Sequence, residues 1–177
     1  MKPIGKYANL VSGKDFTEYI ADDPPAVLLH KVPGGILGLK TGYLATILNR
    51  LDSSVHGSVL AGWGETPPKE FSHLVAELRS AKWSDSTRLL IGAAAKSDIE
   101  VPSPSISPEH GWVLRRGDEY AILAIDEETG IWVCRNKLRP GRERVLRPGD
   151  PVRLGVLDFI FLDATGFYHF ARQHLGR

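Results

Sequence analysis

Cysteine is almost absent from this chain of 177 residues, because Cys134 is its only one and cannot form an internal disulfide. A fold held together by disulfides is therefore excluded, and a reducing compartment is the expected environment. Long apolar runs are also missing, since no stretch approaches the roughly 18 consecutive apolar residues of a membrane-spanning helix. No apolar run of a secretory signal follows residues 1–6. We therefore expect a soluble, cytoplasmic protein that does not bind a membrane.

An excess of charge of either sign is lacking too. Lysine and arginine total 22 against 21 aspartates and glutamates, so the net charge at pH 7 is +1. A basic run does occur between Arg135 and Arg147, but it contains no aromatic residues that would stack on bases. We interpret this run as a solvated edge and expect no nucleic-acid partner.

Motifs of catalysis and metal binding are absent as well. None of the six histidines is paired with another histidine, or with Cys134, at the spacing of a zinc site, so we predict no metal and no cofactor. Ser107 and His110, with Asp98 or Asp126, have the side chains of a nucleophilic triad, but no glycine-x-serine-x-glycine elbow exposes the hydroxyl. The sequence therefore predicts no catalytic residues. A hydrolase with an unrecognised site stays open as the alternative from another class of function.

The first half of the chain carries mostly helical patterns. A short helix is predicted from Ser12 to Ile20, followed by a buried strand over residues 26–30. Apolar residues at i, i+3, i+4 and i+7 then predict amphipathic helices over residues 42–52 and 67–80.

Beyond residue 88, the helical spacing of apolar residues ends. Short apolar runs separated by turn residues follow, and these predict strands. Such strands are expected at residues 89–91, 99–101, 112–114, 120–125, 131–134, 151–154 and 159–162. Many short strands at regular spacing are typical of an antiparallel β-sandwich. We therefore predict a mainly β fold, with an α-helical N-terminal portion over residues 1–85 and a sandwich with a closing C-terminal helix over residues 86–177.

Several short motifs of the second half follow one another in a recognisable order. A strand ends at Gly92, and an aspartate-isoleucine pair at Asp98 opens the next strand. A serine-x-x-histidine motif then ends at His110, and Gly149-Asp150 precedes the closing hairpin. In this order the motifs resemble those of a forkhead-associated (FHA) domain, spanning residues 89–162. The resemblance also implies an alternative to a separate N-terminal portion, in which residues 26–30 are the first strand of the domain and residues 42–85 are an insertion.

This resemblance implies binding of phosphothreonine peptides by loops at one end of the sandwich. The family places an arginine directly after the first glycine, where this chain has Ala93. Ser107 is retained as a phosphate ligand, but the next position, often basic in the family, is Pro108. Thr129 stands where the family has an asparagine that holds the peptide backbone. Arg135, on the hairpin that follows, is the candidate to replace the missing arginine.

The scaffold residues implied by the resemblance are better kept than the phosphate ligands. They are Gly92, His110, Gly149 and Asp150. We therefore predict a non-catalytic module that binds another protein or peptide and whose phosphothreonine recognition is lost or weakened. The alternative is a genuine phosphothreonine reader that uses Ser107 with a basic residue of the Arg135 hairpin.

Overall fold

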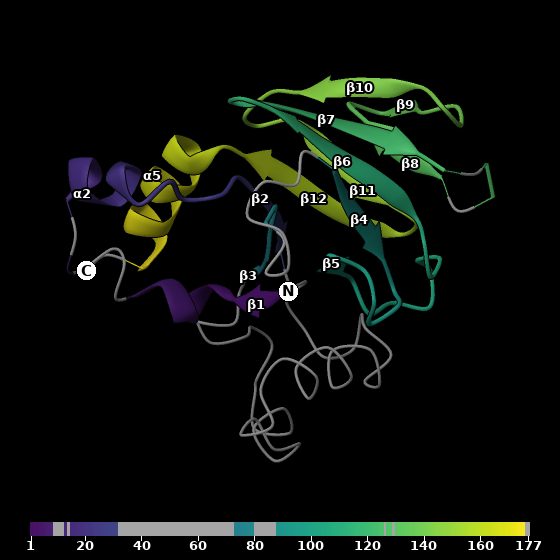
Figure 1. Ribbon diagram of the computed structural model, residues 1–177. Coiled ribbons are helices and arrows are strands. Elements are labelled where there is room, and N and C mark those ends of the chain that lie inside the picture. The colour runs from purple at the N-terminus through teal and green to yellow at the C-terminus, as the bar shows by residue number, and fades with distance from the viewer. Residues whose placement is uncertain are drawn as a thin grey trace, which may run out of the picture.

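The computed structural model describes residues 1–8, 13, 15–31, 73–79, 88–125, 127–128 and 130–175, and these residues form two facing β-sheets with helices along one side (Figure 1). The larger sheet has the order β1-β3-β2-β12-β11-β8-β9, and the smaller sheet has the order β10-β7-β6-β4-β5. Described strand pairs are antiparallel, except the parallel pair of β4 and β5. The mainly β antiparallel sandwich predicted from the sequence is confirmed.

The elements have the following bounds. The strands of the larger sheet are β1 (Lys2–Pro3), β2 (Val27–Lys31), β3 (His73–Glu77), β8 (Ile131–Val133), β9 (Asn136–Lys137), β11 (Pro151–Leu154) and β12 (Leu157–Leu162). Those of the smaller sheet are β4 (Arg88–Gly92), β5 (Ile99–Glu100), β6 (Gly111–Arg116), β7 (Glu119–Ala124) and β10 (Glu143–Leu146). The helices are η1 (Ile4–Tyr7), α2 (Phe16–Ala21) and α5 (Ala164–Leu175).

The main core lies between the two sheets. Strand β12 shows how it forms, because Phe159 and Phe161 are 2% exposed while the alternate residues Asp158 and Ile160 face away from the core. This period of two is the side-chain period of a strand with one face buried. From the smaller sheet, fully buried side chains such as Ile122 meet these rings.

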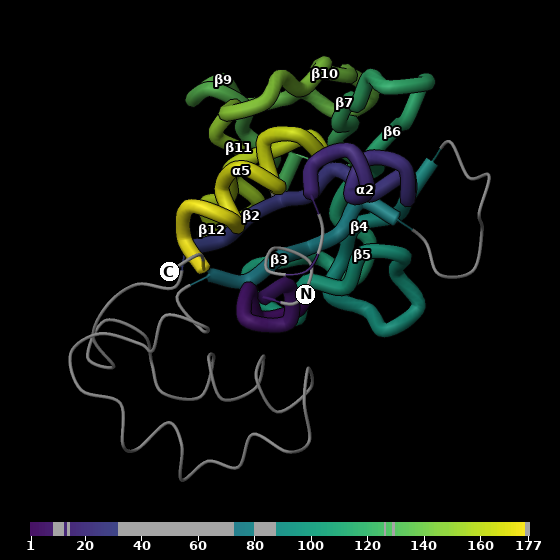
Figure 2. The backbone as a smooth tube through the Cα atoms, turned by 90° about the vertical axis from the view of Figure 1, so that its left-hand side faces the viewer, coloured from purple at the N-terminus to yellow at the C-terminus, as the bar shows by residue number. Residues whose placement is uncertain are grey.

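A second core lies on the outer face of the larger sheet, under α5. Phe167 and Ala171 of this helix pack with Val27, Leu29 and Val75. Helix α2 lies beside α5 in both views (Figures 1 and 2), where the Tyr19 and Tyr168 rings are 5.1 Å apart. Strand β2 is therefore buried on both faces, which explains its continuous apolar run.

One of the predicted N-terminal elements is corrected by the structure. Residues 73–77 of the predicted helix over residues 67–80 form β3, because Leu74, Val75 and Ala76 are all buried in the sheet. A strand buried on both faces has the same short apolar run as a buried helix, so periodicity does not separate them. Of the helix predicted from Ser12 to Ile20, the structure describes α2, which begins at Phe16 and is capped by the side chain of Asp15, whereas Ser12 itself lies outside the described residues.

The strand predicted over residues 26–30 is confirmed as β2. It pairs with β12 on one side and with β3 on the other, so strands from both halves of the sequence share one sheet. The helix predicted over residues 42–52 lies outside the described residues. The division into residues 1–85 and 86–177 stays a prediction.

His73 provides a test of the contact between the larger sheet and α5. Its ring is 9% exposed and lies 5.1 Å from Phe170 and 4.8 Å from His174 of α5. Burial lowers the pKa of His73 to about 4, and the nearby His174, Lys31 and His30 act in the same direction. The unfolded chain, with a histidine pKa of about 6.5, therefore binds the proton first. We expect the stability contributed by neutral His73 to be complete above pH 6.5 and to be lost as the pH falls towards 4.

The measurement is the melting temperature as a function of pH for the wild type and for His73→Phe, which keeps a ring but cannot titrate. The variant should lose less stability than the wild type between pH 6.5 and 4. His169→Gln, at an exposed position of the same helix, is the control and should follow the wild type. An identical pH profile for His73→Phe and the wild type contradicts the prediction.

His110 provides a second test, of the connection between β5 and β6. Its side chain is 1% exposed, and its Nδ1 atom accepts a hydrogen bond of 3.3 Å from the Ser107 backbone N–H. Truncation to alanine opens a cavity and leaves this donor unpaired, so we expect His110→Ala to lower the free energy of unfolding by about 2–4 kcal/mol. Urea denaturation measures the free energy of unfolding, and Glu109→Ala at the exposed neighbouring position is the control. Equal stability of the wild type and His110→Ala would show that this ring is not a structural anchor.

Candidate functional site

Several connections meet at one end of the sandwich, which we call the loop end. It comprises residues 93–98, 101–110, 130 and 155–156. The Gly155 N–H donates to the Gly130 carbonyl over 3.2 Å, and the Val156 N–H donates to the Ser105 hydroxyl over 3.4 Å. The smaller and larger sheets thus contribute to the same surface, as an extended binding site requires.

Gly92 brings two of these loops into contact. A Cβ atom at this position would lie 2.0 Å from the Pro108 carbonyl oxygen, so the close approach requires glycine. The Ser97 hydroxyl donates to the same carbonyl over 3.2 Å. The Ala93 N–H donates to the Ser107 carbonyl over 2.9 Å, which places the two residues side by side.

His110 fixes the backbone of Ser107 from beneath. Its own N–H donates to the Ile91 carbonyl over 2.8 Å, and its ring accepts from the Ser107 N–H. The backbone of Ser107 is therefore bonded on both sides. Its half-buried hydroxyl makes no hydrogen bond with any described residue, so it is available to a ligand.

The charge around Ser107 is balanced rather than positive. Lys96 is the only lysine or arginine of residues 93–98 and 101–110, and it forms an ion pair with Glu109. Ala93 adds no charge, and Pro108 has no N–H to donate. Within these two loops, an anion would meet the neutral Ser107 hydroxyl and a lysine that is already paired with a carboxylate.

The structure does not bring Arg135 together with Ser107. Arg135 lies in the two-residue turn between β8 and β9, where Cys134 and Arg135 have φ values of 51° and 67°. The Cys134 N–H donates to the Pro151 carbonyl, at the start of β11. The loop-end contacts are made by Gly155, four residues further along this chain, which is about 13 Å in an extended strand. Arg135 is therefore at the opposite end of the sandwich.

Thr129 lies outside the described residues, between Glu128 and Gly130. Gly130, in the left-handed region with φ of 62°, is at the loop end through its bond with Gly155.

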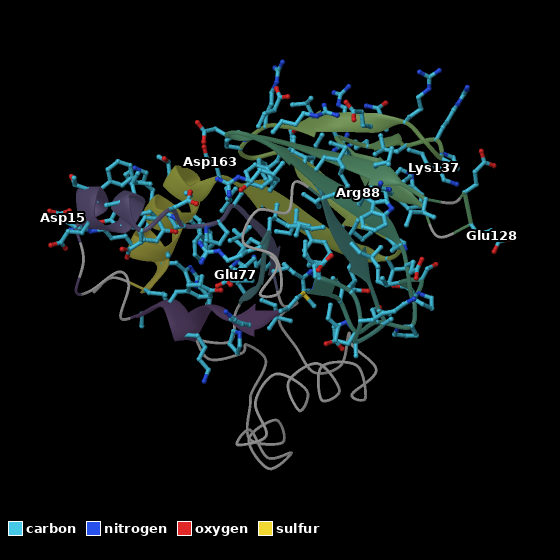
Figure 3. The ribbon with its side chains drawn as sticks, in the orientation of Figure 1. Asp15, Glu77, Arg88, Glu128, Lys137 and Asp163 are labelled. Carbon is cyan, nitrogen blue, oxygen red and sulfur yellow. The ribbon has the colours of Figure 1, made fainter. Side chains whose placement is uncertain are left out.

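Other cations of the basic run between Arg135 and Arg147 do lie near the loop end. Because β9 turns back along β8, the residues after it return towards Gly130. The Lys137 ammonium donates to the Glu127 carbonyl over 2.9 Å, and Figure 3 shows Lys137 and Glu128 at the same end of the molecule. The Gly141 N–H bonds the Ala124 carbonyl over 3.1 Å, so the neighbouring Arg139 and Arg142 are also on this side. A two-residue hairpin turn at 134–135 would have indicated this return.

Gly149 and Asp150, predicted as scaffold residues, hold the turn that precedes β11. Asp150 accepts hydrogen bonds from the Arg147 N–H at 2.9 Å and from the Cys134 thiol at 3.3 Å. Gly149 has a φ of 92°, which favours glycine, and its N–H donates to the Phe161 carbonyl over 2.8 Å. Both residues lie at the end opposite to the loop end.

Neither a metal-binding cluster nor a membrane-spanning helix occurs in the described part of the chain. Its residues include no group of three or more histidines, cysteines, aspartates or glutamates arranged to hold a metal ion. None of its helices is long and apolar enough to cross a membrane.

Among solved structures, the FHA domain of the CT664 protein from Chlamydia trachomatis is 16% identical, with a TM-score of 0.46, over 78% of this chain and 97% of that one. The FHA domain of an Arabidopsis thaliana hypothetical protein is 15% identical, with a TM-score of 0.46, over 79% and 86% of the two chains. The N-terminal FHA domain of Saccharomyces cerevisiae Rad53p, solved with a phosphothreonine peptide, is 17% identical, with a TM-score of 0.44, over 55% and 90%.

No curated protein matches the chain. The family model that does match is that of the FHA domain, over residues 89–155. This range includes Gly92, Ser107 and His110, whose contacts join the loops described above. Residues 89–155 of this chain therefore belong to the FHA domain family, as the order of their motifs predicted.

Proposed function

We propose that this chain is a non-catalytic protein-binding module whose loop end recognises its partner with lost or weakened dependence on phosphothreonine. The observation that carries the proposal is the pairing of Ala93 with Ser107. These residues are joined by a backbone hydrogen bond at the place where the family sets an arginine beside its serine.

The energetics of phosphate binding support this proposal. A doubly charged phosphate is held best by charge-assisted hydrogen bonds, and arginine supplies two at once. Removing one such contact costs on the order of 1.5–3 kcal/mol, or about ten- to a hundredfold in affinity. Here Ala93 removes the main contact, Lys96 is shared with Glu109, and Arg135 lies at the other end of β8. The remaining Ser107 hydroxyl gives little discrimination for phosphate.

An apolar contact is available at the loop end instead. Val156, at the tip of the hairpin between β11 and β12, is 66% exposed, and its backbone bonds Ser105 of the neighbouring loop. An exposed aliphatic side chain beside available backbone and hydroxyl groups suits a peptide or protein surface, because interfaces combine apolar contacts with a few hydrogen bonds. The partner we propose is therefore another protein or peptide.

We also propose that the module is one domain that includes strands from the N-terminal portion. The pairing of β2 with β12, and the packing of α5 against Val27, Leu29 and Val75, support this organisation. Residues 27–31 then take the place of the first strand of the sandwich.

A genuine phosphothreonine reader is the second candidate, because the Ser107 hydroxyl has no partner among the described residues. The two candidates differ in what the addition of an arginine does. We expect the wild type to retain phosphothreonine and unphosphorylated peptide libraries equally. Ala93→Arg should retain the phosphorylated library at least about tenfold better, because it restores one charge-assisted contact. Ala93→Gln, similar in length but uncharged, is the matched control and should stay unselective.

Selective retention of phosphopeptides by the wild type would instead establish the phosphothreonine reader. In that case Ser107→Ala in the wild-type background should remove the selectivity.

A double variant tests whether the loop geometry is the one described. Ala93 and Ser107 are bonded neighbours, so the new arginine and the hydroxyl should hold the same phosphate. We therefore expect Ser107→Ala to reduce the selectivity gained by Ala93→Arg by about tenfold, measured as the ratio of dissociation constants for one phosphorylated peptide and its unphosphorylated form. Pro104→Ala, at an exposed position of the same loop, is the control. Undiminished selectivity in the double variant would mean that Ser107 is not part of the phosphate site.

A further inference from the structure

A second surface lies at the end of the sandwich opposite to the loop end. It is a pocket of about 380 Å³ lined by Glu143, Arg144, Val145, Arg147 and Asp150. We call it the arginine groove. One wall is β10, an edge strand of the smaller sheet, and the other is the turn that precedes β11 in the larger sheet. The groove therefore lies along the open edge of the sandwich.

The two acidic side chains of the groove already accept hydrogen bonds from other groups. Both oxygens of Glu143 accept hydrogen bonds from Arg116, at 2.9 and 2.8 Å, and this contact holds the pKa of Glu143 below its usual value. Asp150 uses one oxygen for the Arg147 N–H and the other for the Cys134 thiol. Neither carboxylate pairs with a guanidinium inside the groove.

The guanidinium groups of the groove have no such partners. Arg144 and Arg147 form no ion pair or side-chain hydrogen bond with the residues that the structure describes. The hydrogen bond to Asp150 raises the pKa of the Cys134 thiol, and the charge of Arg144 acts in the opposite direction. Arg135 lies next to Cys134 in the turn between β8 and β9. Its side chain is exposed and also forms no ion pair or hydrogen bond with the described residues. Arg144 and Arg147 thus line the groove with no carboxylate paired to either guanidinium, which leaves a local excess of positive charge.

The edge strand beside these cations is open to solvent. Among the described strands, β10 pairs only with β7, and its residues Glu143, Arg144 and Val145 are exposed. Val145 is 38% exposed, so an apolar side chain lies next to the charges. An edge strand with this composition can accept an extended segment through its backbone, while pockets for side chains supply specificity.

We propose that the arginine groove binds an extended acidic segment of a partner protein, with carboxylates of that segment paired to Arg144 and Arg147. Guanidinium groups are suited to this role, because their planar forks bond carboxylates through two parallel hydrogen bonds. The proposal goes beyond the loop-end function, because the two surfaces lie at opposite ends of the sandwich and can be occupied together.

An acidic peptide fits the groove better than a nucleic acid does. A nucleic-acid backbone needs cations along an extended face, whereas Glu143 and Asp150 interrupt the positive charge here. Binding of a single-stranded nucleic acid also needs an aromatic ring on which a base can stack. The Trp132 ring on β8 already lies against the cations of Lys137 and Arg153. Carboxylates spaced along a peptide can reach Arg144 and Arg147 without lying next to the acidic side chains of the groove.

The test is a selection of short, unphosphorylated random peptides displayed on phage, against the immobilised full chain. Arg144→Gln/Arg147→Gln removes the proposed site. Arg139→Gln/Arg142→Gln is the matched control, because it removes the same charge from exposed arginines near the loop end. Both double variants should melt at the wild-type temperature, since exposed side chains without partners contribute little to stability.

We expect the wild type and the control to enrich peptides rich in aspartate and glutamate, and Arg144→Gln/Arg147→Gln to lose this enrichment. The dissociation constant of the best acidic peptide should rise at least about tenfold in Arg144→Gln/Arg147→Gln and stay within about twofold in the control. Replacing the carboxylates of that peptide by amides should abolish binding, and oligothymidylate should not displace it.

Three results would overturn the proposal. The first is the absence of acidic enrichment on the wild type, which would mean that these arginines only protect the edge from pairing. The second is an equal loss in both double variants, which would indicate nonspecific attraction. The third is displacement by oligothymidylate at lower concentration than by the peptide, which would assign the groove to nucleic acid. The loop-end variants Ala93→Arg and Ser107→Ala change none of these results, so this test and that of the loop end fail independently.

Discussion

The apolar contact between the two sheets, carried by strand β12, is the interaction on which the rest of the structure depends. Phe159 and Phe161 fill the space between the sheets, and β12 also pairs with β2 and β11. Leu28 of β2 joins this core, while its neighbours Val27 and Leu29 face α5 on the other side. One pair of strands thus connects the sandwich core, the helical layer and both halves of the chain. Burial of this kind is the dominant favourable term in folding.

Short strands connect the loop end with the turns at the opposite end of the sandwich, and this arrangement matters for function. The strands are three to six residues long around β8, β11 and β12, so each end of the sandwich is held at a defined distance from the other. Gly92 and His110 hold the loop end through close backbone contacts, and Gly149 and Asp150 hold the turn at the opposite end. These scaffold contacts do not involve the residue at position 93. The loops of the loop end can therefore form with alanine at position 93.

The sequence predicted the sandwich well because its strands are short apolar runs separated by turn residues. The same reasoning failed for residues 73–77, where β3 is covered by β2 and β1 at its sides and by α5 and the core on its faces. Leu74, Val75 and Leu78 have helical spacing, but tertiary burial on both faces removed the alternation that marks a strand. Arg135 was a reasonable phosphate ligand by proximity to residue 129 along the chain. The left-handed turn at Cys134 and Arg135 places it at the other end of β8 instead.

By itself, the sequence determined the family of residues 89–155, the mainly β fold and the uncharged alanine at position 93, because these depend on residue types in order along the chain. It also determined that Ser107 and His110 share one loop, since three residues of chain cannot separate them by more than about 11 Å. Only the tertiary structure decided which cations approach that loop and which gather in the arginine groove. Both depend on how β8, β9 and β10 reverse direction, and strand reversal is set by pairing with β7 and β11 rather than by local sequence.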